Sequence, residues 1–463
     1  MSDFAQTLEE GGTPPSAKDY RGIMSPEQAR DPEYFPGLAI AVPLGIQHVL
    51  AMFVSNLAPA IIVAGAAGFG YGSDDPSPMI YMIQMAMLFA GIATLFQTIG
   101  AGPMGARLPI VQGTSFAFLP IMIPIVAGQG VAGMAALTTG ALFGGLFHMS
   151  LSLVVGKIRF ALPPLVTGLV VLMIGLSLMR VGVQYAAGGL PADRPDYGAG
   201  IGWMLAGTVA FVTLGLCFFA RGIWATAAVL IGLIAGYGVA ALLGRVSLDP
   251  VAQVGWVALP DPFRFGFAIS ASAILGFCLM GVVSAIETVG DVSGICEGGA
   301  GREATDKELS GATMADGFGT ALAAIFGALP NTSFSQNVGL IAITGVMSRH
   351  VVTVGAVFLI IAGFVPKIGA LVTTIPIEVL GGGVIVMFGM VASAALSILQ
   401  SVTWSQRNML IFGIALSVSL GLQLEPAALS HAGETWGVLL GSGVLPAAVI
   451  AVVLNLIVPG REA

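Results

Sequence analysis

Long apolar runs recur along the whole chain, and they constrain the fold more than any other feature. A helix needs about 20 predominantly apolar residues to cross a bilayer. Runs near that length recur from residue 38 to residue 458, and only 9% of the 463 residues are charged while 56% are hydrophobic. A water-soluble domain is not expected to keep so few charges. The sequence therefore predicts an all-α polytopic membrane protein.

The apolar runs form two sets of seven, separated by a loop around 245–266. In chain order they cover residues 38–66, 79–100, 109–126, 130–155, 163–183, 199–219, 223–244, 267–293, 307–328, 331–347, 350–366, 375–399, 408–424 and 436–458. We number them as segments one to fourteen. Because seven is odd, the two halves are expected to insert with opposite orientations.

The basic residues support this count. With the N-terminus in the cytoplasm, the cytoplasmic side receives twelve: Lys18, Arg21, Arg30, Arg107, Lys157, Arg159, Arg221, Arg302, Lys307, Arg349, Arg407 and Arg461. The opposite side receives five: Arg180, Arg194, Arg245, Arg264 and Lys367. This asymmetry follows the positive-inside rule and predicts cytoplasmic N- and C-termini. Residues 1–35 are polar and contain no apolar signal-peptide core, so they are expected to form a cytoplasmic tail.

Two segments contain a related, proline-broken phrase. "LPIVQGTSF" begins at Leu108 in segment three, and "LPNTSF" begins at Leu329 in segment ten. In transporters built from inverted repeats, paired broken helices meet near the membrane midplane and direct their N-termini at the substrate. The alternative is that the two phrases are similar by chance, since Leu-Pro is common at helix starts.

Three carboxylates lie in or beside apolar segments. Glu287 follows more than two apolar turns, Asp291 lies one turn further along, and Asp316 begins another apolar stretch. A charge in hydrocarbon costs at least about 2.5 kcal/mol, so an intramembrane carboxylate is a candidate functional group. Each is alternatively a structural carboxylate bonded to a neighbouring helix. His48 lies mid-span in segment one and is either functional or a buried packing residue.

The polar side chains after the break in segment ten suit a flat heterocycle. Gln336 and Asn337 each carry an amide with two donors and an acceptor, which matches a ring with alternating N–H and C=O groups. Phe116 and Phe334 end the two related phrases and are placed to stack on such a ring. Ordinary lipid or core contacts are the alternative for both phenylalanines.

Several functions are excluded by missing motifs. The sequence has no Walker motif, no GxSxG elbow and no HExxH motif. Its three cysteines lack metal-ligand spacing, and its basic residues are too dispersed to bind nucleic acid. We therefore expect no enzyme activity, no cofactor, no metal site and no nucleic-acid partner.

"QNVGLIAITG" resembles the signature of the nucleobase–ascorbate transporter family, also called nucleobase:cation symporter-2. The pattern matches at Gln336, Asn337, Gly339, Thr344 and Gly345. "QH" at 47–48, "QGTSF" at 112–116, "ETVGD" at 287–291 and the Asp316 segment also follow the family order. The resemblance covers about residues 36–458.

The resemblance implies fourteen transmembrane segments in two inverted seven-segment repeats, with short antiparallel β-strands in segments three and ten. It implies a core domain formed by residues 36–160 (segments one to four) and 247–368 (segments eight to eleven). It implies a gate domain formed by residues 161–246 (segments five to seven) and 369–463 (segments twelve to fourteen). Members are typically homodimers joined through their gate domains. For this chain, we expect a multi-pass protein of the bacterial inner (plasma) membrane.

The resemblance also implies residue roles. Glu287 and Gln336 would bind the base through their side chains. Phe116 and Ser335 would contact it through backbone amides, while Phe334 would stack on it. Supporting roles in substrate binding and proton coupling are implied for Asn337, Asp291 and Asp316, and His48 would influence affinity for purines.

Selectivity follows from three of the matched positions. Gln336 resembles the purine branch, Asp291 replaces a histidine found in some uracil carriers, and Ser115 resembles members that accept uric acid. The expected order of substrates is uric acid or xanthine first, other oxidised purines next and uracil third.

The mechanism that the resemblance implies is proton-coupled uptake by alternating access, with Glu287 carrying the proton. Sodium coupling through Asp291, Asp316 and exposed carbonyls stays open as an alternative. The residues also leave open a uracil or pyrimidine permease of the same family, an anion transporter of the same architecture, and an intramembrane enzyme or sensor.

Overall fold

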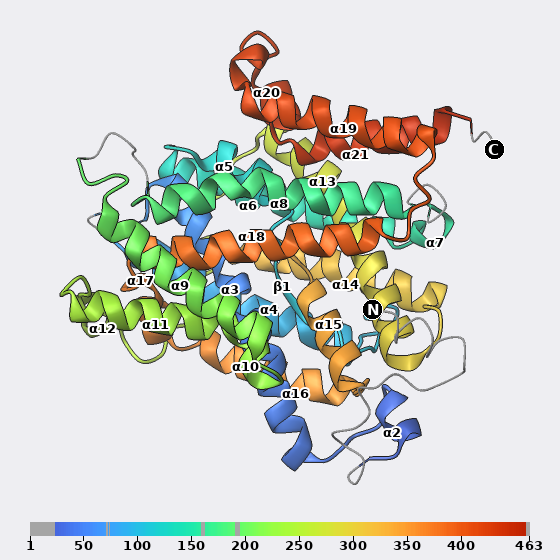
Figure 1. Ribbon diagram of the computed structural model, residues 1–463, viewed down its shortest axis with the longest axis horizontal. Coiled ribbons are helices and arrows are strands. Elements are labelled where there is room, and N and C mark those ends of the chain that lie inside the picture. Colours follow the sequence, from blue (N-terminus) through green and yellow to red (C-terminus); the bar gives the residue numbers. More distant parts are fainter. Residues whose placement is uncertain (1–23, 71–72, 74, 159–162, 190–194, 460–463) are drawn as a thin grey trace.

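The computed structural model describes residues 24–70, 73, 75–158, 163–189 and 195–459. The N-terminal part of the predicted tail, residues 1–23, lies outside the described residues, as do Arg159, Arg194 and Arg461. The chain is mainly helical (Figure 1), which confirms the predicted class.

The first half of the chain contains helices and one short strand. In chain order these are α2 (Pro26–Arg30), α3 (Leu38–Ala67), α4 (Ser77–Thr98), β1 (Gln112–Thr114), α5 (Leu119–Val126), α6 (Gly130–Leu151), α7 (Val155–Ile158), α8 (Pro164–Ala186), α9 (Gly200–Phe219), α10 (Ile223–Thr226), α11 (Ala228–Leu242) and α12 (Asp249–Gln253).

The second half also contains helices and one short strand. Its elements are α13 (Ala271–Ile295), the π-helical turn η3 (Cys296–Ala300), α14 (Asp306–Ile325), β2 (Asn331–Ser333), α15 (Ser335–Thr344), α16 (Arg349–Gly363), α17 (Pro366–Thr373), α18 (Ile377–Leu399), α19 (Gln406–Leu424), the 3₁₀ turn η4 (Pro426–Leu429), α20 (Glu434–Gly441) and α21 (Val444–Ile457).

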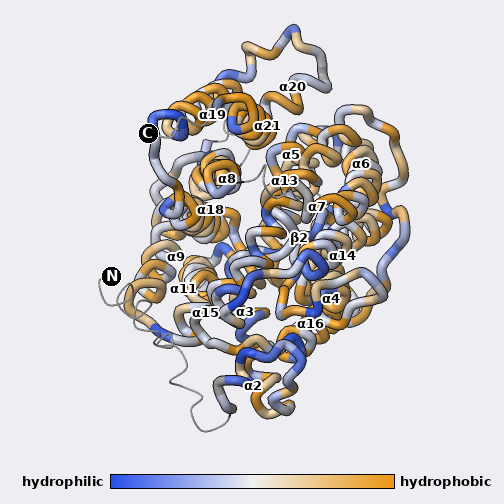
Figure 2. Tube along the Cα trace, turned by 90° about the vertical axis from the view of Figure 1, so that its right-hand side faces the viewer, coloured by the Kyte–Doolittle hydropathy of each residue, from blue (hydrophilic) through white to orange (hydrophobic). Residues whose placement is uncertain are grey.

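Every predicted segment contains a helix, and segments three and ten each contain a strand as well. Within the described residues, eight helices are long and apolar enough to cross a membrane, judged by length and composition. Two bent pairs, α16 with α17 and α20 with α21, raise the number to ten if each pair is one span. Figure 2 shows apolar residues along the helices and hydrophilic residues around α2 and in the connecting loops. Fourteen crossings stay a prediction.

Several short helices were not expected, among them α12 and α17. α12 lies in the loop that separates the two halves, and α17 continues α16 after a bend of 78°. Pro366 begins α17. Because proline lacks an N–H and disfavours the helical conformation in the preceding residue, it ends α16 and lets a new helix start in another direction.

The helices pack as two groups. The first helix group contains α3, α4, α5, α6, α13, α14, α15, α16 and α17 together with both strands, and the second helix group contains α8, α9, α11, α18, α19 and α21. Within the first group, α6 packs along α14 and α13, and α16 packs along α3 and α4. Within the second, α18 runs beside α8 (Figure 1). Contacts between the groups are sparser.

Glycines allow the backbones within each group to approach closely. On α6 and α14, Gly145 and Gly317 face each other: a Cβ on Gly145 would lie 2.8 Å from the Gly317 carbonyl oxygen, and one on Gly317 would lie 2.7 Å from the Gly145 carbonyl oxygen. Gly45 of α3 and Gly355 of α16 make a second reciprocal contact. Small residues at such crossings are typical of membrane helices, where packing rather than the hydrophobic effect holds helices together.

We expect Gly317→Leu to destabilise the protein by at least about 1–3 kcal/mol, because overpacking forces backbones apart. The thermal unfolding midpoint in detergent should fall. Gly207→Leu on α9 is the matched control, since a Cβ at Gly207 meets nothing within 4 Å. Equal midpoints for the two variants would contradict this account of the α6–α14 contact.

Candidate functional site

The two broken segments meet as an antiparallel pair of strands inside the first helix group. The register pairs Gln112 with Ser333, Gly113 with Thr332 and Thr114 with Asn331. The ladder extends past the strands, because the Ser115 N–H donates to the Pro330 carbonyl (2.9 Å) and the Phe334 N–H donates to the Val111 carbonyl (3.0 Å). All six strand residues are buried. The strands that the resemblance implied are confirmed, and each satisfies the other's backbone groups where no water is available.

A cavity of about 220 Å³ lies between this strand pair and helices α8 and α18 of the second group. Its lining residues come from both broken segments, from α13 and from the second helix group: Thr114, Ser115, Phe116, Ala117, Val171, Ile174, Glu287, Thr332, Ser333, Phe334, Ser335, Gln336, Met390, Val391 and Ala394. We call it the strand cavity. It contains six of the ten predicted site residues.

Two polar atoms of the strand cavity lack a partner among the described residues. The Glu287 Oε2 oxygen and the Ser115 hydroxyl are both shielded from solvent, and neither makes a hydrogen bond. Buried polar groups in native proteins are nearly always paired with protein, water or ligand. A carboxylate oxygen and a hydroxyl left in this state, both on the wall of one cavity, are available to a polar ligand or to water there.

Asp291 lies one helical turn beyond Glu287 but is already engaged. Its Oδ2 accepts a hydrogen bond from the Ser333 hydroxyl (2.6 Å), and its Oδ1 accepts one from the Ser335 hydroxyl (2.7 Å). These bonds connect α13 to the end of β2 and to the first residue of α15. Asp291 therefore holds the break in segment ten rather than lining the cavity.

Asp316 joins four elements behind the strand pair. Its Oδ1 accepts hydrogen bonds from the side-chain amides of Gln97 on α4 (2.7 Å) and Gln112 on β1, and its Oδ2 accepts one from the Thr288 hydroxyl on α13. Asp316 is fully buried. Gln97, Gln112 and Thr288 were not predicted, although the two glutamines, as uncharged polar residues flanking a glycine-rich break, offered a signal.

His48 and Asn337 contact each other rather than the cavity. The Asn337 amide nitrogen lies 2.9 Å from His48 Nδ1 and donates to the His48 carbonyl oxygen (3.1 Å). Both residues are buried, and the contact ties α15 to the middle of α3. Any influence of either residue on binding, which stays a prediction, would be indirect.

Asn56 on α3 is a further polar residue that the sequence analysis missed. Its Oδ1 accepts hydrogen bonds from the Thr114 N–H (2.8 Å) and the Thr114 hydroxyl (3.1 Å), and its Nδ2 donates to the Ala86 carbonyl (3.1 Å). A Cβ on Gly113 would lie 2.9 Å from the same Oδ1. Asn56 thus fixes the outer edge of β1 directly before Ser115 and Phe116.

The remaining wall of the strand cavity is apolar. Val171 and Ile174 come from α8, while Met390, Val391 and Ala394 come from α18. Phe116 packs edge-to-face against Phe388 of α18, with ring centroids 5.4 Å apart. Phe334 is almost fully buried. A flat ligand would therefore meet polar groups on one side and hydrocarbon on the other.

The lining carries no basic side chain, and Glu287 is its one ionisable residue. Across the described part of the chain, no three His, Cys, Asp or Glu side chains are grouped to hold a metal ion. The cavity can accept N–H donors and offer amide and hydroxyl groups. Such a set of groups can form hydrogen bonds to a polar ligand.

Comparisons with known proteins agree with this arrangement. The model of the "Permease family" matches residues 39–428. The xanthine permease XanP of Escherichia coli is 34% identical over 436 residues, covering 90% of this chain and 91% of its own. The uric acid permease PucJ of Bacillus subtilis is 32% identical over 427 residues, covering 90% and 92%. The uric acid transporter UacT of Escherichia coli is 33% identical over 423 residues, covering 90% and 86%.

Solved structures share the fold at low sequence identity. The anion transporter SLC26A9 has a TM-score of 0.60 at 11% identity, covering 91% of this chain and 66% of its own. The transmembrane domain of the cyanobacterial bicarbonate transporter BicA has a TM-score of 0.53 at 14% identity, covering 90% and 97%. Both are membrane transporters.

The family match spans most of the chain, and the relatives align over nearly their whole length. The chain is therefore a permease, not an enzyme, and belongs to the nucleobase:cation symporter-2 family.

Proposed function

We propose that this permease takes up an oxidised purine, uric acid or xanthine, together with protons. The observation that carries the proposal is the pair of unpartnered polar atoms, Glu287 Oε2 and Ser115 Oγ, in a cavity between the strand pair and an apolar wall. The names of the relatives XanP, PucJ and UacT support the same substrate class.

The chemistry of the strand cavity fits an oxidised purine. Such a base carries alternating ring N–H and C=O groups on a flat ring. Protonated Glu287 would donate from one oxygen and accept an N–H with the other, while the Gln336 amide would donate and accept at once. α15 begins at Ser335, so its free N–H groups and positive dipole end would favour the oxygen-rich edge. The cavity volume of about 220 Å³ is smaller than the roughly 300 Å³ at which pockets for drug-sized ligands begin, so it suits a ligand as small as a single base.

The proton is assigned to Glu287 by comparing the three carboxylates. Asp291 accepts two hydrogen bonds from serines, and Asp316 accepts three from glutamines and a threonine. Donors of this kind stabilise an ionised carboxylate without a proton. Glu287 Oε2 has no such donor. Protonated Glu287 would donate to an acceptor on the base, and loss of the proton inward would weaken binding and release the substrate.

Alternating access would follow from the two helix groups. In this proposal the first group corresponds to the core domain, residues 36–160 and 247–368, and the second to the gate domain, residues 161–246 and 369–463. Fourteen crossings in inverted repeats, cytoplasmic termini, a bacterial inner-membrane location and a homodimer through the gate domain belong to the same proposal. The position of the strand cavity between the groups supports it, because displacement of one group would open the cavity to either side.

An anion transporter is the main alternative from the fold, since SLC26A9 and BicA share it. An anion site is expected to present a basic side chain. The strand cavity presents a carboxylate and no basic residue, which favours the base over the anion.

Uptake of labelled uric acid into reconstituted vesicles tests the substrate. We expect saturable accumulation driven by an inward proton gradient, with xanthine as the strongest competitor, hypoxanthine and guanine weaker, and uracil weakest. Strongest competition by uracil would favour a pyrimidine permease, and competition by bicarbonate or sulfate alone would favour an anion carrier. Loss of uptake on replacing sodium by choline at fixed pH would show the proton assignment to be wrong.

Glu287→Gln should abolish proton-driven uptake, because an amide cannot take up or release the coupled proton, and it should weaken base binding by at most about 10-fold, because a neutral hydrogen bond is worth about 0.5–1.5 kcal/mol. Uptake and direct binding are measured on the same purified protein. Glu378→Gln is the control: Glu378 lies in the first turn of α18, pairs with Arg245 at 3.2 Å and lies outside the cavity. Normal gradient-driven uptake by Glu287→Gln would remove this residue from the mechanism.

Asn56→Ala should act on the site through β1. It leaves the buried Thr114 N–H without its acceptor, which costs about 1–3 kcal/mol. As a positioning residue, Asn56 should affect the KM for uptake more than the maximal rate per folded molecule. Gln84→Ala removes a partly buried hydrogen bond, to the Ala258 carbonyl at 3.2 Å, away from the cavity. If Asn56→Ala yields less folded protein but leaves the KM for uptake unchanged, the role of Asn56 is purely structural.

A further inference from the structure

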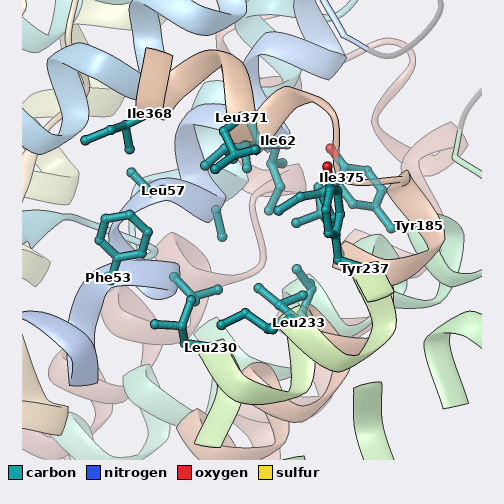
Figure 3. Close-up of a pocket in the computed structure, with 17 residues that line it drawn as sticks. Phe53, Leu57, Ile62, Tyr185, Leu230, Leu233, Tyr237, Ile368, Leu371 and Ile375 are labelled. Atoms are coloured by element: carbon teal, nitrogen blue, oxygen red, sulfur yellow. The ribbon is translucent and has the colours of Figure 1, made fainter. Parts of the chain in front are cut away.

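A second and larger cavity, of about 270 Å³, lies between the two helix groups (Figure 3). Phe53 and Leu57 of α3 and Leu371 of α17 form the side that belongs to the first group, and Leu230 and Leu233 of α11 lie opposite them. Residues of α8 and α18 complete the wall. We call it the apolar cavity. It shares no lining residue with the strand cavity.

The chemistry of the apolar cavity excludes a polar ligand. Its lining contains aliphatic and aromatic side chains and no charged or amide group. Tyr185 and Tyr237 carry the polar atoms, and their hydroxyls lie at one end (Figure 3). The Tyr237 hydroxyl already bonds to the Thr374 hydroxyl (3.0 Å). For comparison, an engineered apolar cavity of about 150 Å³ in another protein stays free of water and binds benzene.

The apolar cavity opens toward the membrane. Ile234 on α11 is 61% exposed and Leu371 on α17 is 49% exposed, and both line it. In a membrane protein, apolar side chains exposed along a span contact lipid hydrocarbon. The molecules with access to this opening are therefore lipid chains. An empty cavity would also forfeit the dispersion contacts of its lining atoms, whereas a hydrocarbon occupant restores them.

A headgroup position lies next to the opening. Lys367 precedes the lining residue Ile368 on α17, donates to the Val251 carbonyl (2.8 Å) and lies 5.0 Å above the centre of the Trp256 ring. Trp and Lys are enriched where membrane helices meet the headgroup layer. A chain that enters between Ile234 and Leu371 would therefore come from a lipid whose anionic phosphate lies near a lysine.

We propose that the apolar cavity binds one acyl chain of a membrane phospholipid. The chain would contact α3 and α17 on one side and α8, α11 and α18 on the other, and so it bridges the two helix groups. On α18, Val384 of the apolar cavity and Met390 of the strand cavity are six residues apart, or about 9 Å along the helix. A displacement of the groups that reshapes one cavity thus reshapes the other, and the lipid stabilises the arrangement that holds it.

Photolabelling tests this proposal without any transport measurement. The full-length protein is reconstituted with a phospholipid that carries a diazirine within one acyl chain, irradiated and digested for peptide mapping. We expect label on the α11 and α17 peptides that contain Leu230, Ile234 and Leu371. Leu233→Trp, which fills the cavity, should lose most of that label. Leu242→Trp, on the same helix but 89% exposed and outside the cavity, should retain it.

Equal labelling of α11 and α17 in Leu233→Trp and in the unmodified protein would overturn the proposal. So would label confined to the outer faces of α9 and α19. If Leu233→Trp does not fold, judged by size-exclusion chromatography, Ala58→Phe fills the cavity from α3 and must give the same loss of label. The label reports lipid binding directly and does not depend on transport. A negative labelling result therefore leaves the purine proposal intact, and a negative uptake result leaves the lipid proposal intact.

Discussion

The structure depends on keeping an extended backbone paired in a place without water. Two segments break their helices in the interior of a membrane protein, and each break exposes N–H and C=O groups that hydrocarbon cannot satisfy. β1 and β2 solve this by pairing with each other, and the bonds at Ser115 and Phe334 extend the pairing beyond the strands. Each break therefore depends on the other for these hydrogen bonds. The pair therefore brings together residues more than 200 positions apart, and the site is built on that meeting.

The polar residues around the strand pair divide by their hydrogen bonds. Asp291, Asp316, Asn56 and the His48–Asn337 contact make hydrogen bonds within the protein and fix the strands and α15 in place. Glu287 and Ser115 keep polar atoms unsatisfied at the cavity wall. A layer of hydrogen-bonded side chains behind Glu287 and Ser115 suits a binding site, because it restricts the relaxation of these two groups toward other partners.

Both cavities lie where the two helix groups meet. Inside each group, glycine contacts such as Gly145–Gly317 bring backbones together and leave no space. Between the groups the packing is sparser, and the spaces differ in chemistry: one is lined by polar groups from the strand pair, the other by hydrocarbon alone. A boundary of this kind suits two bodies that move against each other, and it explains why a substrate and a lipid chain would each find room there.

The sequence by itself determined the membrane class, the order of the helices, the two broken segments and the carboxylate at Glu287. These follow from local composition, because hydropathy, proline and an isolated charge act within a few residues. It did not determine that α17 turns away from α16, that Asp291 and His48 are engaged outside the strand cavity, or that Asn56, Gln97 and Gln112 hold the strands. Helices that are apolar on all sides carry no periodic signal of which face meets a neighbour. Only tertiary packing, through contacts between residues distant in the chain, decided which polar groups are satisfied and which stay free to bind.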